Sequence, residues 1–282
     1  MTLDIDHLRS WTGHTETMAD TVTLAPLRAL TATLDRDDVP EHGDPVPPCW
    51  HWLYFLPVAR QSEIGPDGHP RRGGFLPPVP LPRRMWAGSQ IEFHAPLRAG
   101  QAIERLSRIE DVKLKAGRTG PLVFVKVRHE IRADGALAIV DQHNIVYRDL
   151  PAEGEPSPEY AAAPGDAQWQ RRIVADDVLL FRYSALTFNG HRIHYDRRYV
   201  TQVEGYPGLI VHGPLIATLL LDLLRRERPG AQVRHFTFRA LKPLCDIAPF
   251  DVCGRDNGDG SVALWSRDAA GHLTMDATAL LA

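Results

Sequence analysis

The sequence predicts an α+β protein made of two similar halves, in which two antiparallel sheets each wrap a long central helix. Three observations predict this fold class. Four strand-type segments fill residues 85–148, a long apolar helix begins near residue 213, and further strand-type runs follow it. A segment rich in Pro, Ala, Glu and Gly, residues 150–168, separates the two parts. Each part therefore places helical sequence before an antiparallel meander.

The first half is expected to begin with a helix over residues 15–35. Leu27, Leu30 and Leu34 fall on one face of a helix, and Pro26 suits the first turn after Thr23.

Residues 40–82 are rich in Pro and Gly. Within them Pro48 is placed to start a short buried helix through Trp50, Leu53 and Phe55. The stretch from Gly65 to Pro82 is predicted to be a loop, because neither a helix nor a central strand accepts so many prolines.

Residues 85–148 change character and predict a meander of four strands. Val123, Val125 and Val127 alternate with Phe124, Lys126 and Arg128, which is a period of two. Gly100, the stretch 117–120 and Asp134-Gly135 mark the turns between strands.

The second half repeats the order. A helical segment is followed by a loop, and then by the longest predicted helix, which starts at His212-Gly213 and is ended by Pro229-Gly230. Strand-type runs complete the chain. A sheet that wraps one long apolar helix is a hot-dog arrangement, and the alternative is an α+β domain of other topology. We expect one hot-dog unit over residues 1–149, without catalytic residues, a linker over 150–168, and a catalytic unit over 169–282.

Composition excludes several classes of function. The net charge of −3 gives no electrostatic reason to expect nucleic acid or an anionic membrane as a partner. The N-terminus lacks the pattern of a secretory signal, and the longest apolar stretch, Leu215–Leu224, is too short to span a bilayer. Three cysteines without a C-x-x-C spacing indicate reduced thiols and a cytoplasmic protein.

The segment from Phe181 to Leu215 is the most informative for function. It gathers Asn189, His191 and His194 within six residues and places His212-Gly213 where the apolar helix begins. Titratable side chains on a loop between apolar elements are more often functional than those on a solvated face.

This segment resembles the signature of MaoC-like, R-specific enoyl-CoA hydratases, in which S-G-D-x-N-P-[IV]-H is followed by [IV]-x-H-G-M. Asn189 falls at the aspartate of that motif, Ile193 and His194 match its end, and Val211-His212-Gly213 matches the second block. The version T-F-N-G-H-R-I-H-Y-D is closer to mitochondrial-type 3-hydroxyacyl-thioester dehydratases and to bacterial hydratases of mesaconyl-C4-CoA, itaconyl-CoA and 3-methylfumaryl-CoA. The arginine-rich segment 68–88 also resembles the bacterial group.

The resemblance implies a double hot dog that acts on a CoA thioester without a cofactor. The Gly213 N–H would stabilise the thioester oxygen as negative charge develops there; alternatively, Gly213-Pro214 only starts a helix. His194 would act as base and acid, and Asn189, which cannot act as a base, would orient water. Asp196 could add a carboxylate, but it is better suited to cap a helix or pair with a neighbouring arginine.

The remaining polar residues of the segment allow more than one role. His191 and Arg192 replace the asparagine and proline of the motif and could simply shape the loop. A metal site at His191, His194, Asp196 and His212 is disfavoured, because no third ligand stands at a recognised spacing.

Substrate binding is assigned to Arg83, Arg84, Arg192, His191 and His212. An arginine can bind a distal carboxylate bidentately, but it can also contact CoA phosphates or be merely solvated, and Arg71 and Arg72 are further candidates. A fatty acyl chain would instead need an apolar tunnel, which Trp50, Trp52, Phe55 and Phe75 could line.

The function predicted from the sequence is reversible hydration of a short dicarboxylic enoyl-CoA, with mesaconyl-C4-CoA or itaconyl-CoA giving citramalyl-CoA. The rivals are a 3-hydroxyacyl-thioester dehydratase of fatty-acid synthesis, a hot-dog thioesterase and a non-catalytic acyl-CoA-binding protein. The expected partner is the acyl-CoA alone, and monomer and homodimer both stay open.

Overall fold

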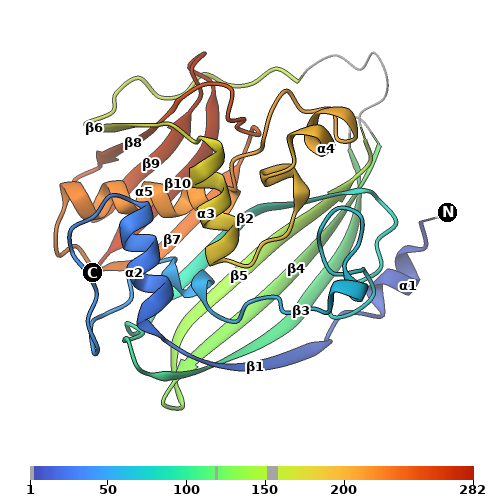
Figure 1. Cartoon of the computed structure of the whole chain (residues 1–282), viewed down its shortest axis with the longest axis horizontal. Helices are drawn as coiled ribbons and strands as arrows, with labels where there is room; N and C mark the ends of the chain where they lie inside the picture. Colours follow the sequence, from blue (N-terminus) through green and yellow to red (C-terminus); the bar gives the residue numbers. More distant parts are fainter. Residues whose placement is uncertain (1–2, 118–119, 151–157) are drawn as a thin grey trace.

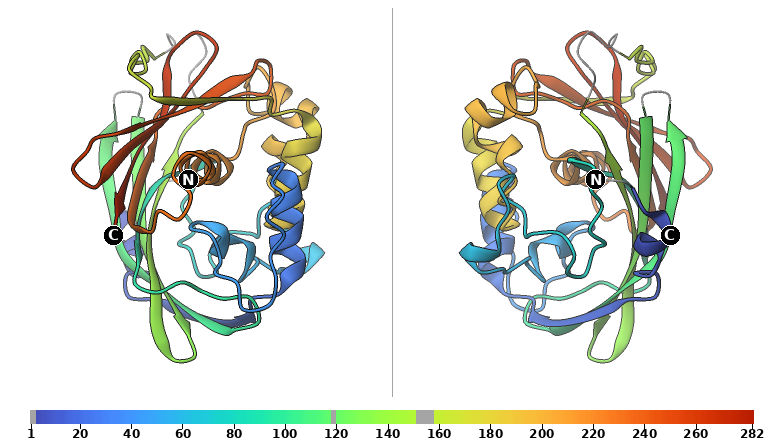
Figure 2. Two further views of the ribbon diagram at one scale, coloured as in Figure 1. Left: turned by 90° about the vertical axis from the view of Figure 1, so that its left-hand side faces the viewer. Right: turned by 90° about the vertical axis from the view of Figure 1, so that its right-hand side faces the viewer.

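The computed structural model describes residues 3–117, 120–150 and 158–282. All ten described strands form one antiparallel sheet, in the order β1-β3-β4-β5-β2-β7-β10-β9-β8-β6. The sheet curves strongly around the helical segments, and the α+β double hot-dog fold is confirmed (Figures 1 and 2). The sheets of the two halves are joined edge to edge, because β2 pairs with β7.

The two halves repeat one topology. In each, a short edge strand comes first, helical segments follow, and four longer strands complete the half. The spatial order 1-3-4-5-2 in the first half is mirrored by 7-10-9-8-6 in the second, so equivalent strands β2 and β7 meet at the centre. The strands are β1 Thr15–Thr21, β2 Arg83–Phe93, β3 Ala102–Gly117, β4 Gly120–Ala133, β5 Ala136–Arg148, β6 Trp169–Ile173, β7 Val233–Ala240, β8 Phe250–Asp256, β9 Ser261–Arg267 and β10 Leu273–Leu281.

The helices lie on the concave side of the sheet. Figure 2 shows α5 enclosed by the sheet, with α2 and α3 side by side across its open side. The helices are α1 Ile5–Arg9, α2 Leu24–Thr33, α3 Asp177–Leu186, α4 Arg197–Gln202 and α5 Gly213–Glu227, and the 3₁₀ turns are η1 Trp50–Leu53, η2 Gln61–Glu63 and η3 Arg192–His194.

Among the described residues, a long central helix is present in the second half and not in the first. Residues from Leu215 to Leu224 of α5 are all buried, as an apolar helix inside a sheet requires. In the first half the 3₁₀ turn η1, with Trp50 and Leu53 buried, enters the core in place of a long helix. The short buried helix expected after Pro48 is therefore confirmed as η1, and the long helix expected in this half is absent from its described residues.

Two further expectations need correction. The helix predicted over residues 15–35 is wrong for its first part, because Thr15–Thr21 pairs as an edge strand with β3 and the helix starts only at Leu24. The strand β6 was not predicted. The four strands of residues 85–148, the loop from Gly65 to Pro82 apart from a single bridge, and the helix from Gly213 are confirmed.

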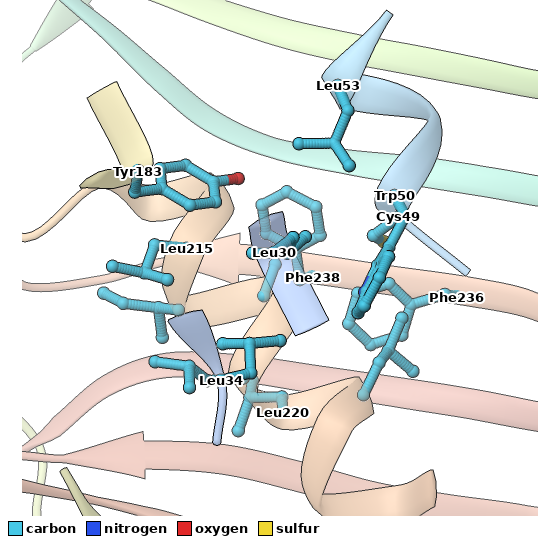
Figure 3. Close-up of a cluster of buried hydrophobic side chains, with 14 of the residues drawn as sticks. Leu30, Leu34, Cys49, Trp50, Leu53, Tyr183, Leu215, Leu220, Phe236 and Phe238 are labelled. Atoms are coloured by element: carbon cyan, nitrogen blue, oxygen red, sulfur yellow. The ribbon is translucent and has the colours of Figure 1, made fainter. Parts of the chain in front are cut away.

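The core runs through both halves without a break. Tyr183 and Leu215 from the second half lie near Leu30 and Trp50 from the first (Figure 3). The division into two units and a linker stays a prediction, and residues 151–157 of that linker lie outside the described residues. No helix in the described part of the chain is long and apolar enough to cross a membrane. All three cysteines are free thiols.

Candidate active site

The end of α3 sets the start of the loop of residues 189–194, which we call the catalytic loop after the role predicted for it. The helix closes at Phe188, which adopts a left-handed conformation (φ 48°) where glycine is usual. The Asn189 N–H then donates to the Ser184 carbonyl at 2.8 Å. This cap turns the chain out of the helix, so that residues 189–191 and 193–194 line a cavity on the concave side of the sheet.

The cavity has a volume of ≈ 1440 Å³ and extends from the second half into the first. Asn189, His191, His194 and Gly213, which the sequence singled out, all line it. A space of this size exceeds what a short acyl group occupies, so it also accommodates part of a larger group to which the acyl group is attached.

His194 is held in an orientation that leaves one ring nitrogen able to accept a proton. It is 7% exposed, and its Nδ1 lies 2.7 Å from the Ile210 carbonyl oxygen. A carbonyl only accepts, so the proton sits on Nδ1 and Nε2 carries a lone pair. Burial lowers the pKa of His194 to about 4, although the bond to Ile210 opposes this shift. The imidazole is therefore neutral at physiological pH and can take a proton at Nε2.

His212 packs against the ring of His194. The two rings stack with centroids 3.7 Å apart and planes 18° apart. His212 is fully buried, and its Nε2 lies 2.8 Å from the Ser184 hydroxyl. It is not among the residues that line the cavity. Its placement favours a role in orienting His194, and the substrate contact predicted from the sequence stays a prediction.

Gly213 supplies a backbone donor at the start of α5. As the first helical residue its N–H cannot bond within the helix, and no partner for it is found in the described part of the chain. A Cβ at this position would meet no atom within 4 Å, so the backbone borders open space. The helix start and the cavity together give this N–H the placement of an oxyanion donor.

Asn189 lines the cavity, and one hydrogen bond orients its side-chain amide. Its Oδ1 accepts the His191 N–H at 3.0 Å, which shapes the loop and identifies the oxygen. The Nδ2 group is left to donate. Asn189 can thus hold a water molecule through the water's oxygen, leaving the water protons free for a base.

The arginines predicted to bind substrate separate into two groups. Arg192 donates to Asp196 at 2.7 Å and to the Pro66 carbonyl at 2.9 Å, and Arg83 is bound by Glu204 and lies over the Tyr206 ring. Their guanidinium groups therefore already have protein partners. Asp196 in turn caps α4 by accepting the Tyr199 N–H.

Arg84 differs from these two. It lines the cavity, and within the described residues no carboxylate lies within 4.0 Å of it. Its positive charge contributes to lowering the pKa of His191, which burial and His194 bring to about 2, so it acts electrostatically on the catalytic loop across the cavity that both residues line. Arg84 is thus a cation available to a ligand at this site. Arg71 also lines the cavity, and Arg72 donates to the Leu81 carbonyl at 2.5 Å.

His69 is a site residue that the sequence interpretation missed. Its ring lies 4.3 Å from that of His191. The contact exists because Gly68 and Gly190 meet: a Cβ on Gly68 would lie 1.8 Å from the Gly190 carbonyl oxygen. Only glycine allows this approach, and the GPDGHP stretch of the first half thereby covers the catalytic loop of the second. In the sequence, these two glycines were the signal that could have indicated this contact.

The buried histidines predict a stability that falls in acid. Burial is the first cause that lowers the pKa of five of them: His69, His129, His191, His194 and His212. Below a pH of about 6.5 the unfolded chain binds protons that these neutral rings do not, so the free energy of unfolding decreases with falling pH, by about 1.4 kcal/mol per unit and group. Urea titrations at pH 7.5 and 5.5 should differ by more than about 3 kcal/mol.

His191→Gln provides the matched variant, because it removes one of the five groups. Its loss of stability between the two pH values should be smaller than that of the unmodified protein. A free energy of unfolding that stays constant or increases toward pH 5.5 would contradict the placement of these rings.

Comparison with known proteins agrees with this geometry. Residues 49–246 match the sequence profile of the hydroxyacyl-thioester dehydratase type 2 family. The chain belongs to this family. It is 49% identical over 253 residues to a mesaconyl-C(4)-CoA hydratase of Chloroflexus aurantiacus, covering 89% of each chain. It is 26% identical to the mitochondrial hydroxyacyl-thioester dehydratase type 2 of Schizosaccharomyces pombe, over 75% of this chain and 78% of that one.

Solved structures support the fold. A MaoC-like dehydratase superposes with a TM-score of 0.72 at 14% identity, covering 96% of this chain and 98% of the other. HtdX of Mycobacterium tuberculosis does so with a TM-score of 0.65 at 18% identity, covering 94% and 99%. In the described part of this chain no three His, Cys, Asp or Glu side chains are grouped to hold a metal ion.

Proposed function

We propose that this protein catalyses the reversible hydration of a short dicarboxylic enoyl-CoA, of the kind that gives citramalyl-CoA from mesaconyl-C4-CoA or itaconyl-CoA. The observation that carries the proposal is the neutral His194, fixed with a basic Nε2, in the same cavity as the Gly213 N–H and Asn189. The 49% identity to a mesaconyl-C(4)-CoA hydratase supports the choice of acyl group.

The residues divide the reaction among them, written here for mesaconyl-C4-CoA, in which the double bond is conjugated with the thioester. Asn189 holds water, and His194 Nε2 takes one of its protons as the oxygen bonds to the β-carbon of the enoyl group. The electron pair of the double bond moves to the thioester oxygen, where the Gly213 N–H stabilises the negative charge. His194 then returns the proton to the α-carbon, which restores the thioester. A water and an enoyl thioester thus give the hydroxyacyl thioester, and no cofactor takes part in this proposal.

Arg84 is the proposed partner of the distal carboxylate. In mesaconyl-C4-CoA that carboxylate is attached to the carbon that receives the hydroxyl, so its cation must lie beside the catalytic loop. Arg84 lines the same cavity as His191 and lowers the pKa of its ring, whereas the guanidinium groups of Arg83 and Arg192 are bound by Glu204 and Asp196. His191 is proposed to line the acyl site together with Arg84.

Replacing Arg84 should separate dicarboxylic from monocarboxylic substrates. In Arg84→Met the loss of a charge-assisted contact, worth about 1.5–3 kcal/mol, should lower kcat/KM for mesaconyl-C4-CoA about 10- to 100-fold. The value for crotonyl-CoA should change much less, because crotonyl-CoA has no second carboxylate. Arg71→Met is the control at the more exposed rim, and equal losses on both substrates would contradict the assignment.

The function itself is tested by mass spectrometry of the products. The protein is incubated with mesaconyl-C4-CoA, itaconyl-CoA and crotonyl-CoA, and a mass gain of one water on a dicarboxylic thioester is expected. A gain only with crotonyl-CoA would place the protein with fatty-acyl dehydratases, and release of free CoA would indicate a thioesterase. A cytoplasmic location and a homodimer are not needed for this chemistry and stay predictions.

A further inference from the structure

The cavity continues beyond the catalytic loop into the first half, where it borders a buried carboxylate. Asp141 on β5 is 1% exposed. Its Oδ2 lies 2.8 Å from His143 Nε2, 2.9 Å from Trp52 Nε1 and 3.2 Å from His51 Nε2. In the described part of the chain its Oδ1 has no hydrogen-bond partner. Asp141, His51, Trp52 and His143 all line the cavity, and we refer to this end as the inner compartment.

An arginine and another histidine complete the inner compartment. Arg105 on β3 lies over the Phe55 ring at 5.1 Å and has Met18 Sδ at 3.0 Å, while Glu16 stands 3.7 Å away. Its Nε is buried, and the described residues offer it no partner. His129 bonds to Ser107 at 2.8 Å, with its ring 4.4 Å from that of His143. A cation here has only weak partners.

Aromatic rings hold the polar groups in place. Trp86 on β2 lies against His143 with centroids 4.1 Å apart and meets Trp52 edge-on at 5.0 Å. Its indole N–H donates to the Gly88 carbonyl at 3.0 Å and lies 3.1 Å from the Ser89 hydroxyl. Because both indole N–H groups are bonded, neither ring can turn aside without losing a hydrogen bond.

The inner compartment is remote from the chemistry of a short acyl group. Tyr147 pairs across from Arg84, and Asp141 lies on the same strand three two-residue steps away. At about 6.6–6.8 Å per step this is ~20 Å along β5. A carboxylate held by Arg84 therefore cannot also reach Arg105, and a five-carbon acyl group leaves the inner compartment unused.

A longer acyl chain would have to enter it. Exposed side chains line the cavity beside the catalytic loop, at Phe181, Phe188 and Tyr195, and also near Phe55, at Val58. Because the thioester must lie at the catalytic loop, the carrier is placed at the exposed side chains there, and a longer acyl chain points toward Asp141 and Arg105. Apolar groups are present there, among them Ile131 and Ile145, so volume alone would not exclude a chain. Methylene groups against the partly exposed side chains of His143 and Arg105, which the buried Asp141 holds polar, would displace water from polar atoms and replace none of its hydrogen bonds.

We infer that Asp141, His143 and Arg105 form a polar barrier that excludes fatty acyl chains and so restricts the enzyme to short acyl thioesters. The inference rests on the proposed hydratase function and adds the residues that set its substrate class. Specificity here comes from an unfavourable contact with the wrong substrate. The apolar tunnel that Trp52 and Phe55 could line is disfavoured, because Trp52 donates to Asp141 and Arg105 lies over the Phe55 ring. A buried, weakly paired cation is retained for selectivity, since it contributes little to stability.

The test removes the polar groups one at a time. Arg105→Met and His143→Phe keep the volume and make the compartment more apolar, and each is assayed with trans-2-octenoyl-CoA and mesaconyl-C4-CoA. The ratio of kcat/KM for octenoyl-CoA to that for mesaconyl-C4-CoA should rise about ten-fold in each variant. Arg108→Met is the control, because Arg108 lies on the same strand but is exposed and does not line this cavity. Its ratio should equal that of the unmodified protein.

The melting temperature separates selectivity from a structural role. Arg105→Met should melt no lower than the unmodified protein, whereas a residue needed for stability would lower it. An unchanged ratio in folded Arg105→Met and His143→Phe, or an unmodified enzyme that already prefers octenoyl-CoA, would overturn the inference while leaving hydration intact. An unmodified protein that hydrates neither substrate would overturn the proposed function, and this inference with it.

Discussion

His194→Ala is expected to lower kcat for hydration about 10³-fold, within the range observed when a general acid–base residue is lost. The variant removes the Nε2 lone pair. Among the described side chains that line the cavity with Gly213, no other has a ring whose tautomer is fixed by a hydrogen bond to a backbone carbonyl. His194→Gln should lose nearly as much activity. Its amide can still donate to Ile210, so the fold is preserved while the base is absent.

The matched comparison is His191→Gln in the same loop. The His191 ring lies 5.5 Å from that of His194 and also lines the cavity. His191 is held in the loop by its backbone N–H, which donates to Asn189, and not by a hydrogen bond from its ring to a carbonyl oxygen. We expect its kcat to fall less than ten-fold. Steady-state rates with mesaconyl-C4-CoA measure both variants. If His191→Gln loses more activity than His194→Gln, His191 is the base and our assignment is wrong.

The catalytic loop was predictable because its residues are close in sequence. Asn189, His194 and Gly213 all border one cavity, as the spacing of the two motif blocks indicates. The roles of these residues stay predictions until they are measured. What the spacing could not show is the tautomer of His194, which depends on the carbonyl of Ile210, sixteen residues away.

The strands were predictable where apolar and polar residues alternate, and the errors arose where they do not. Residues 15–21 read TETMADT and carry almost no apolar side chain, so neither periodicity was visible, and pairing with β3 decides their conformation. The first half lacks a long central helix because its core is filled by the 3₁₀ turn η1 and by aromatic rings. Only the packed structure shows this substitution.

The inner compartment was invisible in the sequence for a related reason. Asp141 and His143 stand in the strand-type run of residues 137–148, where no motif singled them out. In the structure both line the cavity, and Asp141 is bonded to His51 and Trp52, about ninety residues away in the chain. Long-range hydrogen bonds of this kind satisfy a buried carboxylate and cannot be read from local periodicity.

Asp222→Ala is expected to lower the free energy of unfolding by about 3 kcal/mol or more, the range for breaking a buried ion pair from one side. Asp222 lies on the central helix α5 with its side chain fully buried. It accepts from Arg36 and Arg171 at 2.9 Å each and from Arg226 at 2.8 Å. Without the carboxylate, Arg36 keeps Asp38 as a partner, whereas Arg171 and Arg226 lose the one carboxylate that pairs with them among the described residues.

This cluster also connects the two halves of the chain. Arg226 donates to the carbonyl oxygens of Leu34 and Asp35, at 2.7 and 3.1 Å, where the chain leaves α2. Carbonyls that the end of a helix leaves unpaired in the first half are thus satisfied by a cation of the second half, which Asp222 holds in position. Chemical denaturation followed by circular dichroism measures the effect, with Glu227→Ala as control because Glu227 is exposed at the end of the same helix. A loss below about 1 kcal/mol for Asp222→Ala would mean that the arginines find water as readily as they find the carboxylate. A large loss in a single transition would mean that the halves unfold together, as their shared sheet and core require.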